Sequence, residues 1–151
     1  MKKSLENKLF KDYPKIFRKK DLPMSQTCLC WGVATGDGWY MLIDSLCNYL
    51  QFDIDRNGEP QIEADQVKEK YGSLCFYTGG TDRQRGMIAF ASYLSAFICE
   101  DCGSTDNVTQ TKGYITSLCK SCMKKYPKER KPKFRLKTFI FYKFSKLIKG
   151  K

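Results

Sequence analysis

Four cysteines towards the C-terminal end of the chain have the clearest chemical meaning in the sequence. Cys99 and Cys102 form one Cys-x-x-Cys pair, Cys119 and Cys122 form a second, and sixteen residues lie between the two pairs. Thiolates are soft ligands for zinc, and two such pairs at this separation are typical of a zinc ribbon, in which each pair holds the metal from a tight turn. The sequence therefore predicts a four-cysteine zinc site.

The composition indicates what such a site would do. The chain has no histidine, so four thiolates are the only conventional zinc ligand set that it offers. Four protein ligands leave no position for water, and closed sites of this kind stabilise folds and seldom catalyse. Disulfide bonds are the alternative for these thiols, but paired Cys-x-x-Cys units outside secreted proteins favour metal binding.

The other four cysteines, Cys28, Cys30, Cys47 and Cys75, are scattered along the chain. Isolated cysteines are commonly buried as small hydrophobic residues, so we expect packing roles, with a second metal site as the alternative. No early apolar run resembles a signal peptide, and no stretch of about 18 apolar residues predicts a membrane span. We therefore expect a soluble protein in a reducing cytoplasm.

Positive charge is concentrated at the two ends of the chain. The net charge is +11, and residues 123–151 hold twelve Lys or Arg against one Glu. Residues 1–20 hold eight basic and two acidic residues, whereas residues 21–122 hold seven basic and thirteen acidic ones. The ends would attract phosphates or anionic surfaces and the body would repel them. We therefore divide the chain into a compact domain, residues 1–122, and a basic extension, residues 123–151.

Apolar residues at helical spacing predict three helices. The first covers residues 4–12. The second covers residues 37–50 and is capped by its first residue, an aspartate. The third begins at Thr81, which forms a capping-box pattern with Gln84, and continues to Cys99. The second and third are the expected core helices, and the third should couple zinc binding to the core.

Strands are expected between the two core helices. The pattern becomes strand-like from Phe52, followed by a hairpin turn at Asn57-Gly58 and by strands at 61–70 and 73–77. Residues 53–58 also match the opening of a calcium loop, but the position that requires a glutamate is Ala64. We therefore favour the turn and predict a small antiparallel meander.

A ribbon hairpin is expected around Lys112-Gly113, because β-branched residues lie on either side of this pair. Together these elements predict an α+β fold with a small antiparallel sheet, two core helices, a four-cysteine zinc-ribbon knuckle and a basic C-terminal extension. In the extension, residues 134–148 interleave apolar residues with lysines and fit either a helix or a strand. Such a segment suits a nucleic-acid backbone, a partner protein, an anionic membrane or its own domain.

Several segments together resemble known proteins. They are Gly36-Asp-Gly-Trp-Tyr-Met-Leu-Ile43, Gln66-Val-Lys-Glu-Lys-Tyr-Gly-Ser-Leu74 with Phe76-Tyr77, Cys99-Glu-Asp-Cys-Gly103 and Gly113-Tyr-Ile-Thr-Ser-Leu-Cys119. In this combination, about residues 13–122 resemble a family of small phage and prophage proteins with a C-terminal four-cysteine zinc ribbon. The resemblance implies a phage origin, and with it the cytoplasm of a host cell, and a zinc site, but no activity. It does not extend to the basic extension.

No group of residues indicates catalysis. Without histidine, a base or nucleophile must be a carboxylate, a lysine or one of the remaining cysteines, and no set of them stands out. We therefore expect a non-catalytic, zinc-stabilised accessory protein. Its expected partner is a host protein or ribonucleoprotein complex, for instance one that processes nucleic acid or acts in defence.

Two alternatives use the same sequence differently. The first is a zinc-ribbon nucleic-acid-binding protein, and the second is a metal-dependent nuclease built on a carboxylate and lysine pair. For binding nucleic acid or a partner, the candidates are the basic residues beside the knuckle and along the extension: Lys112, Lys120, Lys124, Lys125, Lys128, Arg130, Lys131, Lys133, Arg135 and Lys137.

Overall fold

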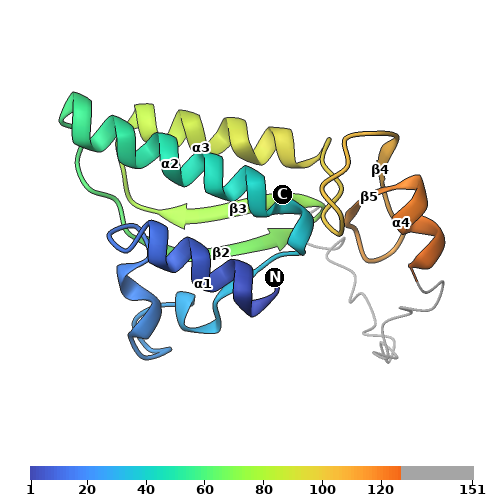
Figure 1. Cartoon of the computed structure of the whole chain (residues 1–151), viewed down its shortest axis with the longest axis horizontal. Helices are drawn as coiled ribbons and strands as arrows, with labels where there is room; N and C mark the ends of the chain where they lie inside the picture. The colour runs from blue at the N-terminus through green and yellow to red at the C-terminus, as the bar shows by residue number, and fades with distance from the viewer. Residues whose placement is uncertain (127–151) are drawn as a thin grey trace, which may run out of the picture.

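The computed structural model describes residues 1–126, which form an α+β fold (Figure 1). Helices α1 (Lys3–Asp12), α2 (Tyr40–Asn57) and α3 (Asp82–Ser95) pack on a sheet of β1 (Val33–Ala34), β2 (Ala64–Lys70) and β3 (Ser73–Thr78). Short 3-10 helices η1 (Arg18–Asp21), η2 (Leu29–Trp31) and η3 (Asp37–Trp39) lie in the connections. A hairpin of β4 (Val108–Gln110) and β5 (Ser117–Cys119), followed by α4 (Lys120–Lys125), forms the knuckle unit.

The sheet is mixed, so the prediction of a purely antiparallel sheet was wrong. β2 and β3 form the expected antiparallel hairpin, in which Val67 lies opposite Phe76. β1 adds to the other edge of β2 in parallel, with Val33 opposite Val67. The buried carboxylate of Glu6 on α1 accepts a hydrogen bond from the Val33 backbone N–H at 2.8 Å. Two residues are too few to show the alternation of a strand, and the contact that places them comes from a residue far away in the sequence. The sequence therefore could not predict β1.

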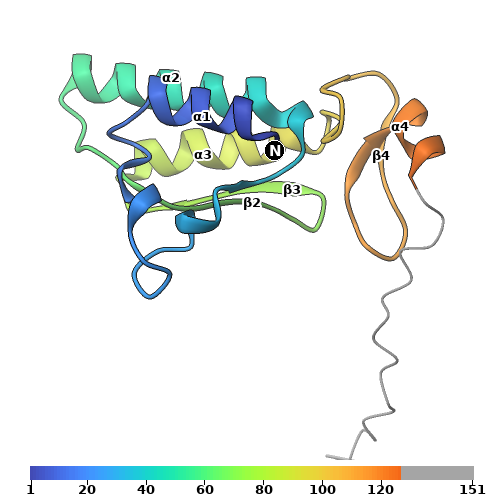
Figure 2. The same ribbon diagram turned by 60° about the horizontal axis from the view of Figure 1, so that its bottom comes forward.

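The hydrophobic core lies between the helices and one face of the sheet (Figure 2). α2 and α3 lie side by side, and both predicted core helices contribute buried residues, as expected. α1 also packs into the core through Leu9. The largest fully buried side chains are Trp39, Phe17, Leu9, Ile16, Leu29, Ile43, Leu50 and Leu74.

α2 is longer than the sequence predicted, and its start is different. The helix continues through Phe52 to Asn57, where a strand and a hairpin turn were expected, and it ends at Gly58 in the left-handed conformation with φ +71°. Asp37 was predicted to cap this helix, but its side chain caps neither α2 nor η3. Its carboxylate instead accepts a hydrogen bond from the Lys2 backbone N–H at 2.6 Å, and Gly36 occupies the cap position of η3.

The start of α3 and the ribbon hairpin agree with the sequence predictions. The Thr81 hydroxyl accepts a hydrogen bond from the Gln84 backbone N–H at 3.3 Å, and the Gln84 side chain accepts one from the Thr81 N–H at 3.0 Å. α3 ends at Ser95, and a turn leads from there to Cys99. β4 and β5 pair on either side of the Lys112-Gly113 turn. The first metal-site cysteine therefore follows the end of a core helix by a single turn.

Candidate metal centre

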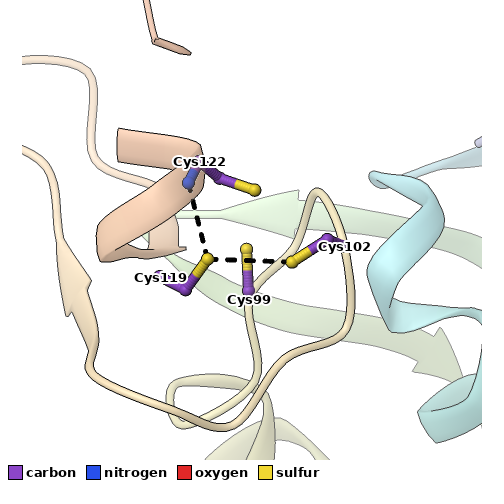
Figure 3. Close-up of side chains that lie close together, drawn as sticks. All are labelled: Cys99, Cys102, Cys119 and Cys122. Atoms are coloured by element: carbon purple, nitrogen blue, oxygen red, sulfur yellow. Dashed lines mark hydrogen bonds between the residues drawn. The ribbon is translucent and has the colours of Figure 1, made fainter. Parts of the chain in front are cut away.

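The four predicted ligands lie together at the end of the body (Figure 3). Their sulfur atoms are all within 4.8 Å of one another, and the Cys102 and Cys119 sulfurs are 3.7 Å apart. Four sulfurs placed about 2.3 Å from one tetrahedral metal ion would be about 3.8 Å from each other. A disulfide would require about 2.05 Å, and all four cysteines are free. The group therefore has the donor set and the spacing of a closed metal site.

The first pair is held by a tight backbone turn. The Cys99 N–H donates to the Ser104 carbonyl, and the Gly103 N–H donates to the Cys99 carbonyl, both at 2.8 Å. Gly103 has a φ of +77°, which glycine adopts without strain. Cys99 is fully buried, while Cys102 is the exposed ligand. This turn aims both sulfurs towards the second pair.

The second pair lies where β5 gives way to α4. The Cys119 sulfur accepts a hydrogen bond from the Cys122 backbone N–H at 3.5 Å and so caps α4. This bond lowers the pKa of the Cys119 thiol to about 7. The thiolate is the form that binds metal, so this backbone contact favours the ligand state of Cys119, whereas a hydrogen bond with Asp101 raises the pKa of the Cys122 thiol. The sequence did not indicate this short helix, which places Cys122 one turn after Cys119.

Two hydrogen bonds from backbone N–H groups seat the first cysteine pair on η3, which leads into α2. The Gly38 N–H donates to the Glu100 carbonyl, and the Gly36 N–H donates to the Glu100 carboxylate, both at 2.8 Å. The indole N–H of the buried Trp39 donates to the Ile98 carbonyl, also at 2.8 Å. The Gly36-Asp-Gly-Trp39 segment is therefore part of the metal centre's support. Sequence reasoning missed this role, although two glycines beside a tryptophan are a signal for close backbone approach.

A second joint connects the ribbon to the turn between β2 and β3. The buried Ser117 hydroxyl donates to the Gly72 carbonyl at 2.7 Å. The Glu100 N–H donates to the Ser117 carbonyl at 2.9 Å, and the Thr116 hydroxyl donates to the Glu100 carboxylate. These hydrogen bonds fix the ribbon hairpin to the β2–β3 turn and to Glu100. The metal centre is therefore bonded to the rest of the fold and is not a separate unit.

The predicted basic residues do not form one group. Lys112 lies in the turn of the ribbon hairpin, whereas Lys120, Lys124 and Lys125 lie on α4, at the metal end of the ribbon (Figure 2). All four side chains are exposed. The remaining predicted residues lie outside the described part of the chain: Lys128, Arg130, Lys131, Lys133, Arg135 and Lys137.

The other four cysteines take no part in this centre. Within residues 1–126, the sulfur group is the single cluster of three or more cysteine or carboxylate side chains close enough to hold a metal ion. Cys47 is fully buried in the core, as expected for a packing cysteine, whereas Cys30 and Cys75 are half-buried and Cys28 is exposed, so the packing prediction was wrong for Cys28. Asp53, from the calcium-like stretch, has its carboxylate bonded to Arg83 of α3.

Large apolar side chains are exposed along α2, along α3 and in the turn that follows α3. We define this helical apolar face by six side chains that are 51–65% exposed: Met41, Tyr49, Phe52, Phe90, Tyr93 and Phe97. A groove of about 250 Å³ lies between the two helices, with Tyr49, Met87 and Phe90 among its lining residues. At roughly 200 Å² per side chain, the six expose on the order of 700 Å².

The predicted third helix contained Phe90 and Phe97, and its pattern did not distinguish a buried side from an exposed one; in the structure Phe97 lies just after the end of α3. α3 has large apolar residues on both its buried and its exposed sides, with Phe97 also in edge contact with Tyr93 at 5.1 Å between ring centroids. A helix with apolar residues on all sides needs neighbours on all sides to bury them. A chain this short has too few layers for that, and this mismatch would have indicated the helical apolar face.

Neither a scan against protein-family models nor searches of curated proteins and of solved structures found a match to this chain. The resemblance to phage and prophage proteins therefore stays a prediction. No helix within residues 1–126 combines the length and the apolar character needed to cross a membrane.

Proposed function

We propose that this protein is a zinc-stabilised binding protein of phage type, which acts in a host cell by occupying a host macromolecule and not by catalysis. The sulfur cluster supports a structural role for the metal, because four protein ligands complete a tetrahedral shell. Cys99, Cys102, Cys119 and Cys122 would hold the ion, and it would supply folding energy to the ribbon.

The helical apolar face carries the binding proposal. Its six side chains together expose on the order of 700 Å², compared with roughly 300–600 Å² for the largest apolar patch on a typical monomer. It also approaches the roughly 800 Å² that each partner contributes to a stable protein interface. We infer that the partner is a host protein with an apolar surface, for instance a subunit of a nucleic-acid-processing or defence complex.

A capture experiment with matched variants tests this proposal. The tagged full chain, the variant Phe90→Ser/Tyr93→Ser and the control Tyr114→Ser are each exposed to host lysate with and without nuclease. Tyr114 is 55% exposed on the ribbon and tests the loss of an aromatic side chain elsewhere. We expect one stoichiometric host protein with the wild type and the control, and its loss with the helical variant. Equal capture by all three proteins, or no stoichiometric partner, would reject the proposal.

Binding of nucleic acid through the basic end is a second candidate function. Its support is the exposed row Lys120, Lys124 and Lys125 on α4, which leads into residues 127–151 with ten Lys or Arg and one Glu. Each neutralised phosphate steepens the salt dependence of binding. Replacing the three lysines by glutamine should therefore reduce the salt slope by about 2 for single strands. An unchanged slope would exclude α4 from the contact.

A further inference from the structure

No α-helix of residues 1–126 covers the side of the sheet opposite α1, α2 and α3, although the 3-10 helices η1 and η2 lie beside β2 (Figure 2). Successive side chains of a strand point to opposite faces, and Val67, Leu74 and Phe76 point into the core. Their neighbours therefore form the other face, in the cross-strand pairs Gln66 with Tyr77, Lys68 with Cys75 and Lys70 with Ser73. We call these six residues the open sheet face.

Two lysines on this side are held by aromatic rings. The Lys68 ammonium lies 5.4 Å from the centre of the Tyr77 ring, and the Lys70 ammonium lies 5.6 Å from the centre of the Tyr71 ring. Neither lysine forms an ion pair with any residue in 1–126. Their positive charges are therefore oriented but not neutralised by a carboxylate. Tyr77 is 41% exposed and Tyr71, at the hairpin turn, is 72% exposed.

A cleft of about 380 Å³ adjoins Tyr77 at one end of the open sheet face. This volume is within the roughly 300–1,000 Å³ of ordinary ligand sites. Its walls combine the Tyr77 ring, the amide groups of Gln26 and Gln66 and the hydroxyl groups of Ser25 and Thr27 with Met24, Cys28 and the carboxylate of Asp65, which pairs with Lys19. A planar group stacked on Tyr77 would thus have polar side chains at its edge.

The combination selects one class of ligand. Lysines without an ion-pair partner along a strand favour an anionic ligand, and exposed tyrosines beside them favour flat rings that can stack. Single-stranded nucleic acid brings both in alternation, phosphates for the lysines and unstacked bases for the tyrosines. In a duplex the bases are already stacked on each other and are unavailable for this contact.

We propose that the open sheet face binds single-stranded nucleic acid, with bases stacked on Tyr77 and Tyr71 and phosphates beside Lys68 and Lys70. This site lies across the sheet from the helical apolar face. A protein partner and a nucleic-acid strand would therefore occupy separate surfaces, and neither proposal depends on the other.

Fluorescence anisotropy with labelled 20-nucleotide DNA and RNA strands, and with a duplex of equal length, tests the proposal on the full chain. The aromatic variant is Tyr77→Leu/Tyr71→Asn, in which asparagine suits the left-handed backbone at residue 71, where φ is +54°. Because stacking is worth about 1–3 kcal/mol per base, we expect at least a fivefold loss of single-strand affinity with an unchanged salt slope. The control Tyr114→Leu should bind like the wild type.

The lysine variant Lys68→Gln/Lys70→Gln tests the phosphate contacts. Loss of two contacts should reduce the slope of log affinity against log salt by about 1.4 for single strands. The control Lys11→Gln/Lys15→Gln removes two exposed lysines that lie away from the open sheet face. It should reduce the salt slope by less than Lys68→Gln/Lys70→Gln does. Thermal unfolding of each variant shows whether the fold is retained.

Three outcomes would overturn this site. The first is single-strand binding by both sheet variants at wild-type affinity, whatever the basic extension contributes. The second is equal binding of duplex and single strand. The third is ultraviolet crosslinking of a thymine-containing strand to the wild type that maps only outside residues 64–78. Crosslinks within that range, together with the two losses above, support it.

Discussion

The backbone of Gly38 lies against the carbonyl group of Cys99. A Cβ atom at Gly38 would be 2.2 Å from the Cys99 oxygen and 2.3 Å from the Gly103 nitrogen, so glycine alone fits. Both atoms belong to the turn that aims Cys99 and Cys102. The 3-10 helix η3, which leads into α2, is therefore in backbone contact with the metal centre, and a disturbance of one should be measurable in the other.

Gly38→Ala should weaken both the fold and the metal site. The added methyl group meets backbone atoms that cannot rotate away, and overpacking of this kind costs about 1–3 kcal/mol of unfolding free energy. We expect a lower denaturation midpoint and weaker zinc binding in competition with a chromogenic chelator. Gly86→Ala in α3 is the control, because its Cβ would have no neighbour within 4 Å. That change should leave zinc affinity unaltered and stabilise the helix by about 0.5–1 kcal/mol. Wild-type zinc affinity in Gly38→Ala would contradict the coupling.

Removal of the metal should be visible through Trp39. Trp39 is fully buried and bonded to the Ile98 carbonyl, whereas Trp31 is 69% exposed. In the variant Trp31→Phe, chelation should shift the remaining emission to longer wavelength and lower the melting temperature, because the joint around Trp39 loosens. Added zinc should restore both. The variant Trp39→Phe, which keeps only Trp31, should show no shift on chelation. An unchanged Trp39 spectrum after confirmed metal loss would show that the joint stays closed without metal.

Asp53 should make the fold sensitive to acid. Its fully buried carboxylate accepts hydrogen bonds from Nε and Nη2 of Arg83, both at 2.8 Å, and another from Asn57. The bonds from Arg83, and then that from Asn57, lower the pKa of Asp53 below its ordinary value. A lowered folded-state pKa means that the contribution is complete above the unfolded pKa of about 3.9 and is lost as the pH falls through the folded value.

Denaturant unfolding at several pH values measures this contribution. Asp53→Asn should be less stable than the wild type at pH 7, and the difference should shrink as the pH falls from about 5 to 3. Asp82→Asn is the control, because Asp82 is 99% exposed on its side chain and pairs with Arg85 at the surface. A constant difference between Asp53→Asn and the wild type over this range would refute the assignment.

Local signals explain which parts of the fold the sequence revealed. The cysteine spacing, the Thr81 and Gln84 capping box and the Lys112-Gly113 hairpin turn each depend on residues close in sequence. Asn57-Gly58 was ambiguous, since this pair suits both a hairpin turn and the left-handed end of a helix. The contact of Asp53 with Arg83, thirty residues away, favours the helix. No local pattern contains that information.

Surface exposure was the other property that the sequence did not reveal. The apolar positions of α3 predict a helix, but which of them remain uncovered depends on how many layers the fold has. The parallel pairing of β1, the seating of Gly36 and Gly38 on Glu100, and the open sheet face are likewise consequences of tertiary arrangement. The site residues that could be predicted from the sequence were the four cysteines, because their spacing along the chain is itself the signal.

Thiol titration should separate the metal ligands from the other cysteines. In the zinc-loaded protein the exposed Cys28 should react first, and removal of zinc should release four further thiols at once. Cys47 should stay unreactive until the protein unfolds, because burial raises the pKa of its thiol and the thiolate is the nucleophile. The variant Cys102→Ser should lower zinc affinity and the number of zinc-protected thiols, while Cys28→Ser should leave zinc affinity unchanged. A titration of the denatured, unreduced protein that finds fewer than the eight thiols of the sequence would indicate disulfides instead, and iron in place of zinc by elemental analysis would revise the identity of the ion.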